Sequence, residues 1–95
     1  MFKNIDVYSL SKIKNEIKII DIRSIEKYNT SHIESSINIP YEYILNNPSK
    51  YLNKSETYCF YCQYGRTSTK LSSILYNQGY KVLNLIGGYE AWLLK

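Results

Sequence analysis

The sequence predicts an α/β domain built on a small, mostly parallel sheet of about five strands. Stretches typical of strands alternate along the 95 residues with stretches typical of helices. The strand-like stretches are rich in β-branched and aromatic residues, and the helix-like ones have capping residues or apolar residues at helical spacing. Because a helix usually joins one parallel strand to the next, this alternation favours a parallel sheet.

A chain of this length has room for one compact domain, and we expect residues 1–95 to form it. A domain this small buries only roughly 60–65% of its unfolded surface and needs an efficient core. The hydrophobic fraction of 44% can supply that core. The sequence contains no repeat, linker or low-complexity segment that would divide it.

Five strands are expected. Ile17–Ile22 is β-branched and nearly continuous, which is typical of a buried strand, and Thr57–Tyr61 combines β-branched with aromatic residues. The full set is Asn4–Val7, Ile17–Ile22, Ser36–Ile39, Thr57–Tyr61 and Lys81–Leu85.

The helices are predicted from their caps and breakers. Ser9 is expected to cap a helix that reaches about Lys14, Ser24 to cap Ile25–Asn29, and Gly79 to end Thr69–Gln78. The remaining helical pieces are Tyr41–Asn46 and Ser49–Leu52, interrupted at Pro48, and Tyr89–Leu94 after a Gly87-Gly88 turn.

Charge and hydropathy exclude several classes of protein. The net charge of +4 is modest and no arginine-rich stretch interleaves with the tyrosines, so we expect no nucleic-acid partner. No apolar run approaches the roughly 18 residues of a membrane span, and the first residues lack the apolar core of a secretory signal. We therefore expect no membrane association and a cytoplasmic location.

The segment Cys62–Ser68 has the composition of an anion-binding loop between a strand and a helix. Ligands of parallel sheets bind at such turns, beyond the carboxyl ends of the strands. Gly65 permits a tight curl around the sulfur, so that backbone N–H groups and the helix N-terminus point inward. Arg66 adds a full positive charge. Together these features favour a thiolate, the nucleophilic form of Cys62.

Other chemistries fit the sequence less well. Cysteine phosphatases place an arginine six positions after the cysteine, where this chain has Ser68. Cys59 and Cys62 have a CxxC spacing, but Cys59 falls inside a predicted strand, and the chain has one histidine and no second cysteine pair for zinc. We interpret Cys59 as a core residue. A transient Cys59–Cys62 disulfide stays open as an oxidation product.

Several segments in order resemble the rhodanese family over nearly the whole chain. The first is Asp21-Ile22-Arg23, and the second is the Ser31–Pro40 segment around His32. The loop from Cys62 to Ser68 resembles the family's active loop, Cys-x-x-Gly-x-x-Ser. Leu85-Ile86-Gly87-Gly88 with Trp92 resembles its closing pattern. The resemblance implies a three-layer domain with helices on both faces of the sheet.

The resemblance also implies roles for individual residues. Cys62 is expected to be the nucleophile and sulfur carrier, with Asp21 and Arg23 supporting its loop. Arg66 is expected to attract thiosulfate-like donors, and the Ser68 hydroxyl to bond the sulfur. The persulfide is expected to be cradled by the backbone N–H groups of Gln63, Tyr64, Gly65, Arg66, Thr67 and Ser68.

The implied activity is transfer of sulfane sulfur through a Cys62 persulfide, without metal or cofactor. The acceptor is expected to be cyanide in an assay and a thiol or protein in the cell. Two alternatives stay open at this stage. One is a sulfur-carrier module fed by a cysteine desulfurase, with little turnover on free thiosulfate. The other is a redox switch that uses Cys59 and Cys62.

Overall fold

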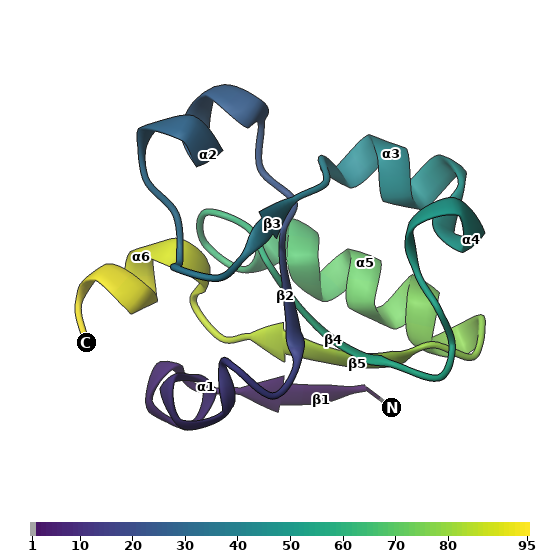
Figure 1. Cartoon of the computed structure of the whole chain (residues 1–95), viewed down its shortest axis with the longest axis horizontal. Helices are drawn as coiled ribbons and strands as arrows, with labels where there is room; N and C mark the ends of the chain where they lie inside the picture. Colours follow the sequence, from purple (N-terminus) through teal and green to yellow (C-terminus); the bar gives the residue numbers. More distant parts are fainter. Residues whose placement is uncertain (1) are drawn as a thin grey trace.

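A computed structural model describes residues 2–95 and contains a five-stranded sheet in which all neighbouring strands are parallel (Figure 1). The strand order is β1-β5-β4-β2-β3, which places β4 at the centre. This confirms the predicted α/β fold with a parallel sheet. The strands are β1 Lys3–Ile5, β2 Lys18–Asp21, β3 Ile37–Asn38, β4 Thr57–Tyr61 and β5 Lys81–Leu85.

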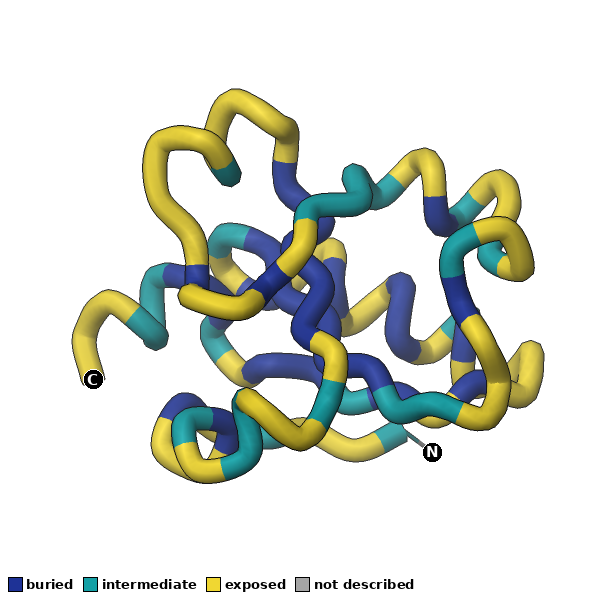
Figure 2. Tube along the Cα trace, in the orientation of Figure 1, coloured by how far each residue is buried: buried dark blue, intermediate teal, exposed yellow. Residues whose placement is uncertain are grey.

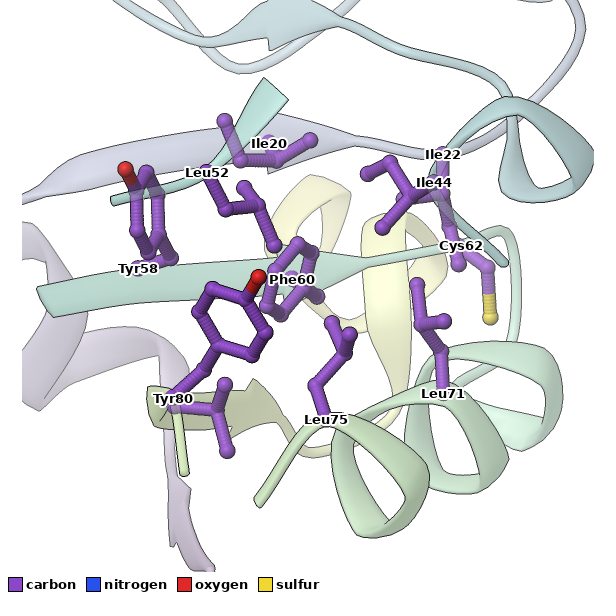
Figure 3. Packing of buried hydrophobic residues seen from close by; sticks show 11 residues of the cluster. Ile20, Ile22, Ile44, Leu52, Tyr58, Phe60, Cys62, Leu71, Leu75 and Tyr80 are labelled. Carbon is purple, nitrogen blue, oxygen red and sulfur yellow. The ribbon is translucent and has the colours of Figure 1, made fainter. Parts of the chain in front are cut away.

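Helices cover both faces of this sheet and complete the predicted three layers. On one face, α3 and α5 bury Ile44 and Leu71 against Ile20 and Phe60 (Figure 3). On the other face, α1 and α6 pack against the opposite side chains of the same strands. The helices are α1 Val7–Ile13, α2 Ile25–Thr30, α3 Tyr41–Asn46, α4 Pro48–Tyr51, α5 Arg66–Asn77 and α6 Gly88–Leu93.

The two faces follow from the alternation of side chains along β4. Tyr58 and Phe60 belong to the cluster under α5, whereas Cys59 and Tyr61 belong to the cluster under α1 and α6. All four are buried, as expected for the central strand of a parallel sheet. Helix α2 differs from the other layers because it buries no residue and lies largely in solvent (Figure 2).

Four predicted helix starts are too late, two of them by one residue: α4 begins at Pro48 and α6 at Gly88. The first strand ends at Ile5, because Val7 already belongs to α1.

The other two helix starts, those of α1 and α5, are three residues too late. Asp6, not Ser9, caps α1: its carboxylate Oδ1 accepts the Ser9 N–H at 2.8 Å, and this hydrogen bond lowers the pKa of Asp6. Helix α5 begins at Arg66 rather than at Thr69, because Gly65 takes a left-handed conformation (φ +97°) that ends the loop early. The predicted cap at Ser24 is confirmed.

Among residues 2–95, no helix has both the length and the apolar character that crossing a membrane requires.

The core under α5 supplies a first test of this packing. Leu71 is fully buried beside Cys62, so Leu71→Ala should lower the free energy of unfolding by about 2–5 kcal/mol in urea titrations. The control is Leu94→Ala, whose side chain is 86% exposed and should change that free energy by less than about 0.5 kcal/mol. Equal effects of the two substitutions would contradict the packing described here.

Candidate active site

Cys62 follows β4 directly and lies at the carboxyl edge of the sheet. The Cys62 loop, which we define as residues 62–68, consists of a tight turn through Gly65 and then the first turn of α5. Figure 3 shows the sulfur at the end of the row of packed side chains, near Leu71. The nucleophile predicted from the sequence is therefore at the strand-to-helix turn where ligands of parallel sheets bind.

Two backbone amides of the loop point at the Cys62 sulfur. The N–H of Gly65 donates to Sγ at 3.1 Å, and the N–H of Ser68 at 3.3 Å. The amides of the other four expected cradle residues make no hydrogen bond to this sulfur in the described part of the chain. Both contacts come from the start of α5, where the helix dipole also favours negative charge. This arrangement stabilises an anionic sulfur.

The first turn of α6 holds the loop from outside. The N–H of Tyr89 donates to the Cys62 carbonyl at 2.9 Å, and the N–H of Glu90 donates to the Gln63 carbonyl at 3.0 Å. Gly88, at φ +62°, makes this approach possible, because a Cβ there would lie 2.4 Å from the Cys62 carbonyl oxygen. The carbonyls of Cys62 and Gln63 thus accept hydrogen bonds from α6 on the outside of the loop. The amides of the loop remain free to face the sulfur.

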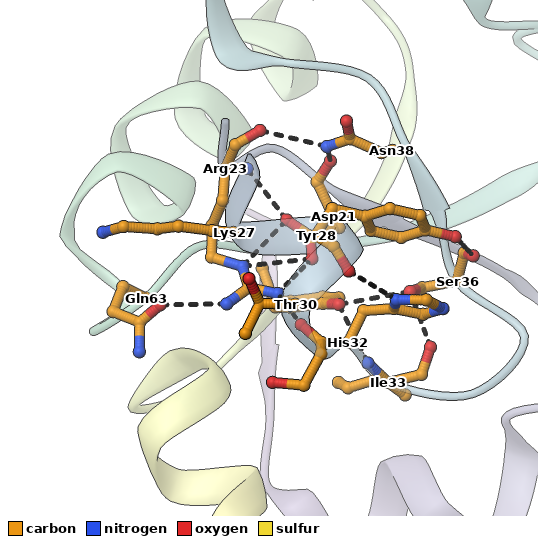
Figure 4. Close-up of polar contacts among 12 residues, drawn as sticks. Asp21, Arg23, Lys27, Tyr28, Thr30, His32, Ile33, Ser36, Asn38 and Gln63 are labelled. Atoms are coloured by element: carbon orange, nitrogen blue, oxygen red, sulfur yellow. Dashed lines mark hydrogen bonds and ion pairs between the residues drawn. The ribbon is translucent and has the colours of Figure 1, made fainter. Parts of the chain in front are cut away.

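Arg23 ties the end of β2 to the Cys62 loop (Figure 4). Its Nη2 donates to Asp21 Oδ2 at 2.7 Å and to the Ser31 carbonyl at 2.7 Å, while Nη1 donates to Gln63 Oε1 at 3.0 Å. Asn38 fixes the same turn by donating its side-chain N–H to the backbone carbonyls of Asp21 and Arg23. Asp21 and Arg23 are thus in place to support the loop.

The Asp21–Arg23 pair is buried, and each group satisfies the other. Burial opposes the charge of Arg23, but the hydrogen bonds and the charge of Asp21 outweigh it and raise the pKa of Arg23. The guanidinium also lies over the ring of Tyr89, 4.4 Å from its centroid. Removing one partner of such a pair leaves a buried charge unmatched and costs about 3–5 kcal/mol.

Three hollows adjoin the loop. One of about 360 Å³ is lined by Gln63 and Tyr64. Cys62 lines only the smallest of the three. This hollow, about 260 Å³, is also lined by Arg23, Lys27 and Thr67. The largest one, about 630 Å³, is lined by Tyr64 and Arg66 but not by Cys62. The arginine expected to attract donors therefore lines a different hollow, and Lys27 is the exposed cation that lines the hollow of Cys62.

Sequence reasoning missed Lys27 because scattered lysines are usually a solvated face. A signal was nonetheless present. Lys27 is the third residue of α2, a helix that starts directly after the Asp21-Ile22-Arg23 segment at the carboxyl end of β2. Tyr64 does not line the hollow of Cys62, and its side chain is 68% exposed.

Cys59 is isolated from Cys62 by the sheet itself. It belongs to the cluster under α1 and α6, whereas Cys62 belongs to the cluster under α5. Both thiols are free, and burial raises the pKa of the Cys59 thiol to about 12. In the described part of the chain, no group of three or more His, Cys, Asp or Glu side chains is placed to hold a metal ion.

Comparison with known proteins agrees with this geometry. The family model of the rhodanese-like domain matches residues 6–95. The chain belongs to the rhodanese-like domain family. The thiosulfate sulfurtransferase GlpE of Coxiella burnetii is 32% identical over 96 residues, which cover 97% of this chain and 88% of that protein. These relatives support a sulfurtransferase of the rhodanese type.

Two further proteins extend the comparison. A rhodanese-like domain protein from Staphylococcus aureus has a similar structure, with a TM-score of 0.85 and 30% identity over 96% of this chain and 91% of that one. The putative sulfur carrier protein YrkF of Bacillus subtilis is 30% identical over 80% of this chain, which spans 41% of that longer protein.

The clamp by α6 predicts a strong effect of Gly88→Ala. The new Cβ would overlap the Cys62 carbonyl oxygen, so the loop must move, and we expect a loss of about 3 kcal/mol in unfolding free energy with slower alkylation of Cys62. Urea titration and iodoacetamide kinetics measure the two effects.

Gly79→Ala is the matched control for this substitution. Gly79 also has a positive φ of +97°, but a Cβ there meets only the Lys54 side chain, at 3.6 Å or more. It should cost about 1 kcal/mol of backbone strain and leave Cys62 alkylation unchanged. Unchanged Cys62 reactivity in Gly88→Ala would contradict the proposed clamp.

Proposed function

We propose that this protein is a sulfurtransferase that carries sulfane sulfur on Cys62. The observation that supports this most directly is the pair of amides, from Gly65 and Ser68, that donate to the Cys62 sulfur. An anion-stabilising cradle favours the thiolate over the thiol and suits the terminal sulfur of a persulfide equally well. The sequence match to a thiosulfate sulfurtransferase supports the same reaction.

The proposed cycle has two displacement steps. In the first, the Cys62 thiolate attacks the outer sulfur of thiosulfate. A new S–S bond forms, the bond between the two sulfurs of the donor breaks, and sulfite leaves with its electron pair. In the second, a thiophilic acceptor such as cyanide attacks the outer sulfur of the persulfide and takes it as thiocyanate. The Cys62 thiolate is thereby restored, and neither step needs a metal or an organic cofactor.

The surroundings of Cys62 supply the remaining parts of this proposal. Lys27 lines the hollow beside the sulfur and would attract the doubly charged donor. Arg23 holds Gln63 and is itself neutralised by Asp21, so it positions the loop and contributes little net charge. Arg66 lines the largest hollow, which Cys62 does not line, and we expect it to contribute less to donor binding than Lys27.

A second candidate function uses the same persulfide chemistry. In it the protein is a sulfur carrier that receives its sulfur from another protein, such as a cysteine desulfurase. The similarity to a putative sulfur carrier protein favours it. The redox switch is disfavoured, because Cys59 and Cys62 pack in different cores on opposite faces of the sheet.

Intact mass spectrometry after incubation with thiosulfate tests the proposal. We expect a gain of one sulfur atom, about 32 Da, that is removed by cyanide and absent in Cys62→Ser. Cys59→Ser is the matched control and should gain the same mass. No gain with thiosulfate, but a gain with a cysteine desulfurase and cysteine, would favour the carrier function. Loss of the gain in Cys59→Ser would favour the redox switch.

The role of Lys27 predicts a specific change in kinetics. Lys27→Ala should raise KM for thiosulfate about three- to tenfold with little change in kcat, because one exposed charge contributes about 1 kcal/mol to anion binding. The effect should shrink at high salt, which screens exposed charges. Arg66→Ala is the comparison and should have the smaller effect. A larger increase in KM for Arg66→Ala would contradict this assignment.

A further inference from the structure

We propose that Asn84 is a positioning residue that turns the hydroxyl proton of Ser68 away from Cys62. Asn84 is buried on β5 and lies behind the first turn of α5, outside every motif singled out in the sequence. Through this contact the Ser68 oxygen accepts a hydrogen bond from the Cys62 thiol instead of donating one to the thiolate. The inference deepens the proposed function and rests on Cys62 being its reactive cysteine.

The orientation of the Asn84 amide follows from its other neighbours. The Thr69 hydroxyl donates to the Gly65 carbonyl at 2.6 Å, and a carbonyl can only accept. With its proton used there, the Thr69 oxygen must accept from Asn84, which lies 3.0 Å away and therefore presents Nδ2. The same Nδ2 donates to Asn4 Oδ1 at 3.0 Å. The remaining amide atom, Oδ1, is directed at Ser68.

The orientation of the Ser68 hydroxyl follows in turn. Its oxygen lies 2.6 Å from Asn84 Oδ1, which can only accept, so the single hydroxyl proton points to Asn84. The other acceptor within reach is the Gly65 carbonyl, 3.3 Å away. A proton directed at that carbonyl would not be donated to the sulfur either. The Ser68 oxygen consequently presents a lone pair to Cys62 Sγ, at 3.4 Å, and accepts the S–H proton.

Two opposing influences therefore act on the sulfur. The amides of Gly65 and Ser68 stabilise its anionic form, whereas the Ser68 lone pair stabilises the thiol. For the hydroxyl to donate to an anionic sulfur, its 2.6 Å hydrogen bond to Asn84 must break. Asn84 thus restrains the reactivity of the resting thiol. The hydroxyl expected from the sequence to bond the sulfur does so as an acceptor.

No charged group is altered by changing Asn84. The charges near Cys62 are Arg23, paired with Asp21, and the exposed Lys27, which line its hollow; Arg66 starts α5. Glu90 accepts from the side chain of Gln63. Any change in the reactivity of Cys62 in an Asn84 variant must therefore come through hydrogen bonding or access.

The test measures the rate of Cys62 alkylation by iodoacetamide from pH 5 to pH 9, with the products identified by mass. Asn84→Ala frees the Ser68 hydroxyl, so alkylation below neutral pH should be about three- to tenfold faster and the pH profile should move to lower pH. Asn84→Leu, which fills the same space without an acceptor, should show the same shift and guards against loss of folding in the smaller variant.

The control is a double-mutant cycle with Ser68→Ala. In that background Asn84→Ala should have no effect, because the hydroxyl through which it acts is gone. Asn4→Ala removes only the side-chain oxygen that accepts from Asn84 Nδ2. It should leave the pH profile of Cys62 alkylation unchanged. An equal acceleration with and without Ser68, or no acceleration in both Asn84 variants, would overturn the inference. Alkylation needs no sulfur donor, so failure of sulfur transfer would not be mistaken for either result.

Discussion

The site depends on two backbone hydrogen bonds, those from the N–H groups of Tyr89 and Glu90 to the carbonyls of Cys62 and Gln63. A loop that surrounds an anion must turn its amides inward, and its carbonyls then need donors on the outside. The start of α6 supplies those donors, because its own first amides have no partner within the helix. The close approach is possible only because Gly88 has no side chain.

The rest of the fold brings these parts to one edge of the sheet. The parallel order places the carboxyl ends of β2, β4 and β5 side by side, and each strand brings one or more residues to the site. From β4 comes Cys62, from β2 the Arg23 that holds Gln63, and from β5 both Asn84 and the Gly-Gly turn before α6. The two loop-side cations line different hollows: Lys27 lines the hollow of Cys62, and Arg66 lines the largest one.

Much of this could be predicted from local sequence. The bounds of β4 and β5 match the prediction. In β4 a run of β-branched and aromatic residues leaves little choice, and β5 is limited by Gly79 before it and by the Gly87-Gly88 turn after it. The start of α1 was not, since Asp6 and Ser9 are both good caps and burial of Val7 and Leu10 decides between them. Roles that arise from residues far apart in the chain, such as Asn84 behind Ser68, are absent from local patterns because only the sheet order creates them.

Amide chemical shifts in the presence of thiosulfate report on the cradle around the Cys62 sulfur itself. If the Cys62 loop stabilises an anionic sulfur, conversion to the persulfide should move the ¹H and ¹⁵N resonances of Gly65 and Ser68 more than those of other residues. The shifts should reverse on adding cyanide and be absent in Cys62→Ser. Unchanged Gly65 and Ser68 resonances in a protein that has gained sulfur would show that the sulfur is held elsewhere, and would contradict the account.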